Sequence, residues 1–210
     1  MDILQEISAF LQKGKAKNVE ELVSKALSDG LSAKQILEGG LLHGMDIIGT
    51  KFKNDEVYVP EVLIAAKAMN AGTALLKPHL KGADVKSSGK VILGTVKGDL
   101  HDIGKNLVRM MMEGKGLEVV DVGIDVPAEK FIEAAKAENA NIIACSALLT
   151  TTMGEIKTIA DAATAAGIRD KVKIMAGGAP VTEAYCNSIG ADLYAPDAAS
   201  AADAAVAACK

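Results

Sequence analysis

The strongest constraint on the fold is an alternation in the second half of the chain, where short apolar runs and helix-like stretches take turns. The apolar runs are VILGTV (91–96), LEVVDV (117–122), NIIACSA (141–147), VKIMAGG (172–178) and DLYAPDA (192–198). A stretch of helical character follows each run, opening near residues 102, 127, 152 and 180, and an alanine-rich segment closes the chain. Five strands that alternate with five helices predict a parallel sheet with helices on both faces.

The first 80 or so residues follow a different pattern, which predicts helices only. Apolar residues recur at helical spacing over residues 3–11, 19–27, 37–48 and 63–76. Gly30 is expected as the C-terminal cap of the second helix and Ser32 as the N-cap of the third, while Pro60 lies in the first turn of the fourth. Four amphipathic helices of this length make a small bundle.

Between the two halves, the stretch KGADVKSSGK (81–90) lacks apolar periodicity and is rich in Gly, Ser and Lys, so it predicts a linker. We therefore expect two domains, a helical bundle at residues 1–88 and an α/β domain at residues 89–210. Ligands of open α/β sheets bind at the carboxyl ends of the strands. The segments GDLHDIG, GGAP and APDA follow the first, fourth and fifth predicted strands, and they are the candidate binding loops.

The composition excludes several classes of protein. Aromatic residues make up 3% of the chain and the net charge is −4, which argues against nucleic-acid and anionic-membrane surfaces. Cys145, Cys186 and Cys209 lie far apart without metal-ligand spacing, which favours reduced thiols in the cytoplasm. The N-terminus lacks the features of a signal peptide, and we expect no apolar run long enough to span a bilayer.

Common cofactor motifs are also missing. The turn after the first predicted strand lacks the dinucleotide fingerprint, Gly114-Lys115-Gly116 does not supply a Walker loop, and no Gly-x-Ser-x-Gly elbow is present. The sequence has no close set of His, Cys and carboxylate residues that would cage zinc.

An acid–histidine pair remains in the first candidate loop, where Asp99 and His101 flank Leu100. A carboxylate that accepts the Nδ1–H of an imidazole fixes its tautomer and leaves Nε2 free to bind a metal. One histidine supplies one ligand, so such a metal must bring its other ligands in a macrocycle, haem or a corrin. Haem favours a closed pocket, whereas this loop lies at the edge of an open sheet. The alternative is a loop histidine that is only hydrogen-bonded to a neighbour.

Three elements together resemble the signature of cobalamin-binding domains, in order and in spacing. They are Asp99-x-His101-x-x-Gly104, Ser146-x-Leu148 and Gly177-Gly178. The helical half contributes KNDEVYVPEVLIAAKAM (53–69), which resembles the cap helices of methyl-carrying corrinoid proteins. The resemblance covers nearly the whole chain. It is closest to the small corrinoid proteins that serve methanol, methylamine, quaternary-amine or methoxyaromatic methyltransferases, and extends to the cobalamin module of methionine synthase.

This resemblance implies a fold of an N-terminal four-helix bundle cap followed by a Rossmann-like (flavodoxin-like) five-stranded parallel α/β cobalamin-binding domain. It also implies that the dimethylbenzimidazole base of cobalamin leaves the cobalt and that His101 replaces it as the lower axial ligand. Asp99 is then expected to hydrogen-bond His101, and Thr152 to complete the relay at a place where relatives often have Ser.

The resemblance places further residues around the cofactor. The expected neighbours of the corrin and its nucleotide tail are Gly98, Asp102, Ile103, Gly104, Ser146, Leu148, Thr150, Gly177, Gly178 and, within YAPDA at the far end, Ala195, Pro196 and Asp197. In the cap, Tyr58, Val59 and Val62 are expected nearest the methyl group.

The implied function is that of a methyl carrier rather than a stand-alone enzyme. Cob(I)alamin takes a methyl group from a substrate on a partner methyltransferase, expected to be a TIM barrel, and the resulting methylcobalamin yields it to a second methyltransferase that acts on tetrahydrofolate or a thiol. A reductive activating protein is implied as well. The general character of the chain favours methylamine or quaternary-amine donors, and methoxyaromatics and methanol stay open.

Three other readings compete. The subunit of an adenosylcobalamin-dependent mutase shares the α/β module, but the cap sequence argues against it. A cobalamin sensor needs a DNA-binding segment, and 210 residues leave no basic face for one. A flavodoxin-like receiver without a corrinoid needs clustered acids and a late lysine, which are not evident.

Overall fold

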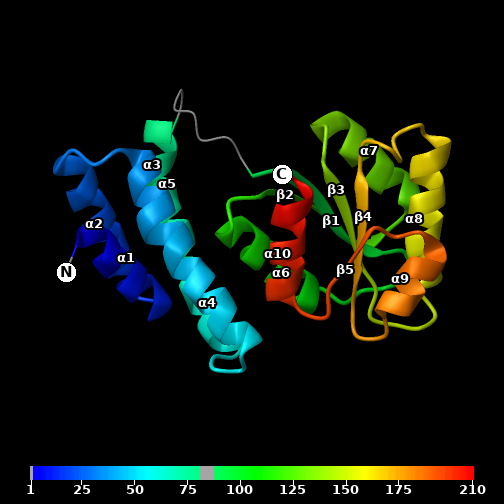
Figure 1. The fold of residues 1–210 in the computed structure, drawn as a ribbon, viewed down its shortest axis with the longest axis horizontal. Helices are drawn as coiled ribbons and strands as arrows, with labels where there is room; N and C mark the ends of the chain where they lie inside the picture. The colour runs from blue at the N-terminus through cyan, green and yellow to red at the C-terminus, as the bar shows by residue number, and fades with distance from the viewer. Residues whose placement is uncertain (1, 81–87) are drawn as a thin grey trace. The chain divides into compact units, whose positions relative to one another are not determined.

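The computed structural model describes residues 2–80 and 88–210, and Figure 1 shows their elements. The chain divides into two compact units, residues 1–86 with 114–116 and residues 87–113 with 117–210. The predicted linker at residues 81–90 falls mostly outside the described residues, and the predicted boundary at residue 88 stays a prediction.

The first unit is helical throughout its described part. Its elements are α1 (Ile3–Gln12), α2 (Ala16–Ser28), α3 (Ala33–Ile36), the π-helix η1 (Leu37–Leu42), α4 (His43–Lys53) and α5 (Val59–Leu80). Because α3, η1 and α4 follow one another without a break, they make one long helix, and the four predicted helices are confirmed.

The π-helical turn was not predicted, and two glycines explain its packing. A Cβ atom on Gly39 or Gly40 would lie 3.0 Å from the side chain of Leu4 or Ile7 on α1. Without side chains, η1 can approach α1 more closely than an ordinary helix would. A search for 3.6-residue periodicity does not detect such a local change in helical pitch.

The helix ends behave as the sequence predicts. The Ser32 hydroxyl accepts a hydrogen bond from the backbone N–H of Gln35 (3.2 Å), and the Gln35 side chain accepts one from the N–H of Ser32 (3.0 Å), which is a capping box. Gly30 has φ +89°; its N–H donates to Leu27 O, and the next N–H donates to Ala26 O, which closes α2 in a Schellman motif.

Helix α5 differs from one expectation. Among the described residues it is long and apolar enough to cross a membrane by length and composition, with a mean hydropathy of 1.2. Its buried residues, however, repeat at helical spacing and pack into the bundle, with α2 lying along it. They are Val62, Ala65, Ala66, Ala68, Met69, Gly72 and Leu76.

The second unit contains the predicted five-stranded sheet. Its strands are β1 (Lys90–Val96), β2 (Glu118–Val126), β3 (Ile142–Ser146), β4 (Lys173–Gly177) and β5 (Leu193–Tyr194). They pair in the order β2-β1-β3-β4-β5, and every pair is parallel, which is the flavodoxin-like order.

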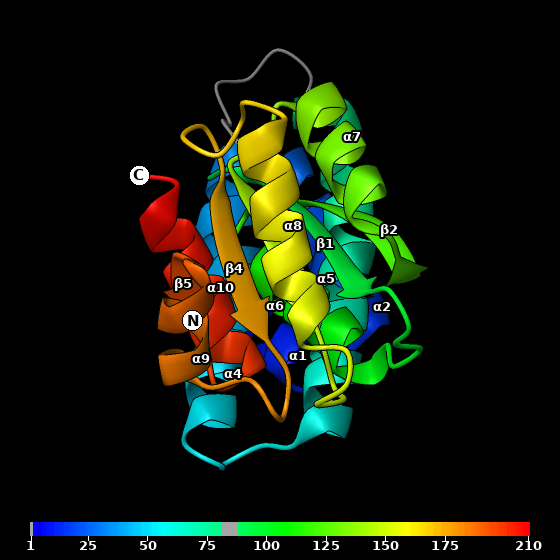
Figure 2. The same ribbon diagram turned by 90° about the vertical axis from the view of Figure 1, so that its right-hand side faces the viewer.

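Helices cover both faces of this sheet, as the alternation predicts. They are α6 (Ile103–Gly114), α7 (Ala128–Glu138), α8 (Gly154–Ala165), α9 (Glu183–Ile189) and α10 (Ala198–Ala208). Figure 2 shows α7, α8 and α9 in front of the sheet, with α6 and α10 behind it. Since both faces are buried, the central strands read as continuous apolar runs, and side chains such as Ile92, Ile143 and Ile174 are fully buried.

The ends of β2 and β5 differ from the prediction. Strand β2 continues to Val126 instead of ending at residue 122, and a bulge at Gly123 lets its pairing with β1 go on. The register pairs Gly94 with Gly123 and Val96 with Val126, so three steps along β2 oppose two along β1. Strand β5 keeps only Leu193 and Tyr194, because the following residues lead into the cap of α10.

Candidate functional site

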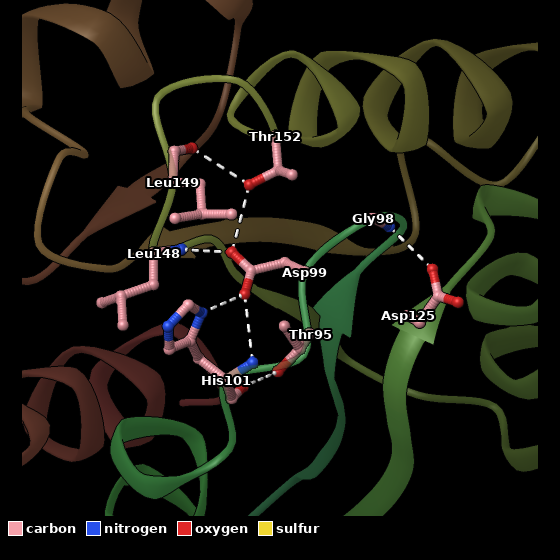
Figure 3. A network of polar contacts seen from close by, with 8 residues as sticks. All are labelled: Thr95, Gly98, Asp99, His101, Asp125, Leu148, Leu149 and Thr152. Carbon is pink, nitrogen blue, oxygen red and sulfur yellow. Dashed lines mark hydrogen bonds and ion pairs between the residues drawn. The ribbon is translucent and has the colours of Figure 1, made fainter.

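The candidate site lies where the loops after β1 and β3 meet at the carboxyl edge of the sheet. The strand order reverses between these two strands, because β2 lies on one side of β1 and β3 on the other. Ligands of doubly wound sheets bind at such a switch point. Figure 3 shows the side chains that this arrangement brings together.

Asp99 lies at the centre of the polar network in Figure 3 and is fully buried. Its Oδ1 accepts hydrogen bonds from the ring Nδ1 of His101 (2.6 Å) and from the His101 backbone N–H (3.1 Å). Its Oδ2 accepts from the backbone N–H of Leu148 (2.6 Å) and from the Thr152 hydroxyl (3.1 Å). One carboxylate therefore joins the loop after β1 to the loop after β3.

These bonds keep the carboxyl ionised. Burial alone would raise the pKa of Asp99, but the hydrogen bonds from the Leu148 N–H, the His101 ring, the His101 N–H and the Thr152 hydroxyl outweigh it. The pKa is lowered from 3.8 to about 2. At neutral pH Asp99 is an anion that only accepts hydrogen bonds, so the network assigns the ring hydrogen of His101 to Nδ1.

In its neutral form His101 thereby presents Nε2 with a free lone pair. Its side chain is 49% exposed, and no described residue hydrogen-bonds to its Nε2. Exposed apolar side chains lie nearby along the same two loops, namely Leu100, Ile103, Leu148 and Leu149. A neutral imidazole nitrogen among apolar side chains is suited to ligate a metal.

Thr152 lies where the relay was predicted. It is buried, and its hydroxyl is 3.1 Å from Asp99 Oδ2 and 3.0 Å from the carbonyl of Leu149. Because a hydroxyl has one hydrogen, it donates to one of these two oxygens at a time.

Small residues line the neighbouring strand ends, at Ser146, Ala147, Gly177, Gly178 and Ala195. A Cβ atom on Gly178, which has φ +130°, would lie 1.9 Å from the carbonyl oxygen of Ala147, so the loops after β3 and β4 touch through their backbones. A Cβ atom on Gly177 would meet only the Ala195 oxygen at 3.8 Å, and one on Gly104 would meet nothing within 4 Å. Within the described residues, no side chain comes within 4 Å of a Cβ atom at either of these two glycines.

Of the other residues predicted to line the cofactor, two bond to neighbouring side chains or backbone and the rest differ in exposure. The Asp197 carboxylate caps α10 by accepting the Ser200 N–H (2.8 Å) and hydroxyl (2.7 Å). Asp102 accepts a bond from the Asn106 side chain (3.2 Å). Thr150, Ile103 and Pro196 are exposed, while Ala195 is buried. The proximity of all these residues to a cofactor stays a prediction.

The three predicted cap residues differ in their exposure within the helical unit. Tyr58 is 65% exposed just before α5, where its N–H donates to the Glu61 carboxylate (3.1 Å). Val59 is half-buried, and Val62 belongs to the buried stripe of α5. Their place beside a methyl group stays a prediction.

Sequence reasoning missed two residues that bond the backbone of residues 98–101, which we call the histidine loop. The Thr95 hydroxyl donates to the His101 carbonyl (2.7 Å), and the Asp125 carboxylate accepts the Gly98 N–H (2.7 Å). Thr95 follows apolar residues in a strand, and Asp125 owes its direction to the bulge in β2, so neither gave a signal in the sequence.

The site fits a metal that brings its own equatorial ligands. It offers one nitrogen donor with a fixed tautomer, and the described residues contain no group of three His, Cys, Asp or Glu side chains that could hold a bare ion. The open space beside Gly104 and Gly177 leaves room for the parts of a large cofactor. These are the properties that a corrin with a separate nucleotide tail needs from its protein.

Comparisons with known proteins agree with this chemistry. Two parts of the chain, residues 3–77 and 89–206, each match a family described as a B12 binding domain. The dimethylamine corrinoid protein of Methanosarcina barkeri is 43% identical, covering 95% of this chain and 94% of that protein. Trimethylamine corrinoid protein 1 of Methanosarcina acetivorans is 44% identical, covering 85% of this chain and 83% of its own.

A solved structure shows a similar fold. A chain of the methanol:cobalamin methyltransferase complex MtaBC from Methanosarcina barkeri matches with a TM-score of 0.88 and 30% sequence identity, covering 98% of this chain and 80% of that one.

Proposed function

Since this chain belongs to the corrinoid proteins built on the B12 binding domain, we propose that it is the methyl carrier of a methylamine methyltransferase system. It receives a methyl group from a methylated amine held by a partner methyltransferase and delivers it to a second methyltransferase. The observation that carries this proposal is the unbonded ring nitrogen His101 Nε2, which is held in place by a fully buried carboxylate on Nδ1.

His101 is the residue that would hold the cobalt, through Nε2. When bound, the corrinoid supplies the methyl-transfer chemistry at its cobalt, and the protein supplies binding and orientation. Ser146, Leu148 and the glycines at 104, 177 and 178 would admit the nucleotide tail. The space that a side chain would otherwise fill beside Gly104 and Gly177 supports this role.

The other members of the network act through the histidine. Asp99, whose pKa is about 2, stays ionised and keeps the ring hydrogen on Nδ1, which raises the electron density at Nε2. Leu148 N–H and the Thr152 hydroxyl hold the second carboxylate oxygen, so the carboxylate that the ring bonds is fixed to the loop after β3. The chain thus controls where the donor atom lies and which ring nitrogen carries the hydrogen of the neutral imidazole.

The partners follow from the role of a carrier. The methyl donor is proposed as dimethylamine or trimethylamine, because relatives at 43% and 44% identity bear those names. A TIM-barrel methyltransferase would hold that amine, a second enzyme would pass the methyl group to a thiol or tetrahydrofolate, and a reductive activating protein would restore the carrier. We place the protein in the cytoplasm, where its three free cysteines would stay reduced.

Electron paramagnetic resonance tests the ligand. The protein is loaded with hydroxocobalamin, reduced to the Co(II) state, and compared with and without ¹⁵N-histidine. We expect the nitrogen superhyperfine pattern to change from three lines to two upon labelling. His43→Ala is the matched control and should keep this change, whereas His101→Ala should abolish it. Bound cobalamin with no effect of the label would contradict the ligand role of His101 on which the proposal rests.

A partner assay tests the donor. The loaded, reduced protein is mixed separately with methyltransferases specific for monomethylamine, dimethylamine, trimethylamine and methanol, each with its own substrate, and substrate loss is followed. We expect one of the two enzymes for dimethylamine and trimethylamine to turn over fastest. Turnover with the methanol enzyme alone would overturn the proposed donor while leaving the carrier role intact.

A further inference from the structure

The histidine loop is fastened to the sheet by three hydrogen bonds that leave the imidazole untouched. The Thr95 hydroxyl donates to the His101 carbonyl (2.7 Å), the Gly98 N–H donates to Asp125 Oδ1 (2.7 Å), and the Asp125 N–H donates to the Asp99 carbonyl (3.0 Å). Figure 3 shows both side chains on the sheet side of the loop, away from the ring. The backbone of residues 98–101 is therefore held at both ends.

Thr95 is a polar residue in an apolar place. It is fully buried in β1 between Gly94 and Val96, and it is paired in the register with Ser146 of β3. A buried hydroxyl without a partner is unfavourable, and Val would fill the same volume without that cost. The hydroxyl of Thr95 is thus explained by its hydrogen bond to the backbone carbonyl of His101, the proposed cobalt ligand.

Asp125 has an unusual backbone conformation. Its φ is +51°, a left-handed conformation that side chains other than Gly, Asn and Asp rarely adopt. It lies in the bulged part of β2, and bulges commonly re-aim a side chain next to a functional site. The bulge turns the Asp125 carboxylate toward the Gly98 N–H, at the start of the histidine loop. Gly98 itself has φ +81°, so the loop begins with a turn that favours glycine.

We propose that Thr95 and Asp125 are positioning residues that fix how far the His101 imidazole reaches from the sheet. The inference rests on the proposed ligand role of His101. Asp99 holds the ring, but it lies on the same loop and moves with it, apart from its bonds to Leu148 and Thr152. The bonds from Thr95 and Asp125 tie that loop to β1 and β2 instead. Without them the Asp99–His101 pair stays formed and stays bonded to the loop after β3, but the distance of the loop from β1 and β2 is no longer fixed by side-chain bonds.

Two matched pairs of variants test this. Thr95→Val keeps the shape of the side chain and removes the donor, whereas Thr95→Ser restores the donor. Asp125→Gly keeps the left-handed backbone and the N–H that bonds Asp99, but removes the carboxylate; Asp125→Asn keeps an acceptor oxygen and tolerates the same φ. Each protein is loaded with hydroxocobalamin, reduced to Co(II), and measured by paramagnetic resonance with ¹⁵N-histidine. The dissociation constant for cobalamin is measured in parallel by absorbance titration.

We expect the fraction of cobalt with a histidine nitrogen to fall at least threefold in Thr95→Val and Asp125→Gly and to recover in Thr95→Ser and Asp125→Asn. The pH at which the nitrogen signal is half lost should also rise in the two deficient variants, which a purely structural change would not cause. Asp125 is exposed, so its variants keep the test valid if Thr95→Val does not fold.

The outcomes separate the two proposals. If the wild-type protein shows no histidine nitrogen on cobalt, the ligand role of His101 fails and this inference fails with it. If the wild type shows the nitrogen and all four variants match it in fraction and in pH profile, the ligand role stands and the positioning role of Thr95 and Asp125 is wrong.

Discussion

Two aspartates at opposite ends of the same sheet, Asp192 and Asp99, have carboxylates with different kinds of bonding partner. Asp192, at the amino ends of β4 and β5, pairs with Arg169 (2.9 Å) and Lys173 (3.6 Å) and accepts the backbone N–H of Ile174 (2.7 Å). Asp99, at the carboxyl end of β1, is bonded by two backbone N–H groups, one hydroxyl and one imidazole.

The difference lies in where the negative charge goes. Arg169 and Lys173 are cations, so the charge of Asp192 is neutralised inside the protein and the cluster only ties strands together. The donors around Asp99 are neutral groups and a ring with a second, free nitrogen. Its charge therefore acts on the ring, and through the ring on whatever binds Nε2. The amino end of the sheet stabilises the fold, and the carboxyl end prepares a ligand.

The largest effect should come from His101→Ala. It removes the one free nitrogen of the network. Loss of a residue that only hydrogen-bonds a metal ligand lowers activity by up to roughly 100-fold, and we expect the loss of the ligand itself to lower the rate of methyl transfer by more than that. Since the ring is half-exposed, the free energy of unfolding should change by less than about 1 kcal/mol. Transfer assays with the cognate methyltransferase and urea unfolding measure the two. Exogenous imidazole should restore part of the activity, and full activity without it would remove His101 from the mechanism.

Asp99→Asn and Asp192→Asn test the comparison directly, because each replaces a carboxylate by an amide of the same shape. At Asp99 the amide NH₂ meets other donors, and we expect a loss of roughly 1–3 kcal/mol in stability from unpaired buried groups, with cobalamin affinity lower by roughly 10–100-fold. At Asp192 we expect about 1 kcal/mol of destabilisation and no change in affinity. Thermal unfolding and absorbance titration measure both, and equal losses of affinity would remove the distinction between the two ends.

Acid should destabilise the fold through Asp99. A carboxyl with a lower pKa in the folded than in the unfolded chain stabilises the fold above the unfolded pKa. For Asp99 the shift from 3.8 to about 2 corresponds to roughly 2 kcal/mol, present above about pH 4 and lost as the pH falls toward 2. Urea unfolding of the cofactor-free protein between pH 2 and pH 6 measures this slope.

The control for this slope is Asp99→Asn, which cannot titrate at this position. Its stability should change less than that of the wild type between pH 4 and pH 2, by about the same 2 kcal/mol. Identical slopes in the two proteins would show that the hydrogen bonds of the folded state do not lower the pKa of Asp99.

The sequence predicts most of this fold because its patterns are local. Capping at Ser32 and Gly30 and the five apolar runs depend on residues close in the chain, and all were confirmed. The π-helical turn at η1 and the bulge in β2 depend on what packs across from them, which periodicity does not contain. The pairing of Asp99 with His101 was predictable from two residues in one loop, and Thr152 from the resemblance. The bonds from Thr95 and Asp125 were not, because one looks like an ordinary strand residue and the other is aimed by the bulge.

The smallest effect is expected for Gly104→Ala, which tests whether this position is a glycine because the fold needs it or because the cofactor needs the space. Gly104 lies in the first turn of α6, and a Cβ atom there would meet nothing within 4 Å. Gly104→Ala should therefore stabilise the protein by about 0.5–1 kcal/mol, since alanine favours a helix. If the space is reserved for the corrinoid, the same change should weaken cobalamin binding several-fold. Opposite signs in thermal unfolding and in absorbance titration would show that the glycine serves the cofactor, because a fold that needed it would lose stability instead. A gain in both would mean that the space beside Gly104 is only solvent, and the carboxyl edge would then bind its cofactor without using that side of the loop.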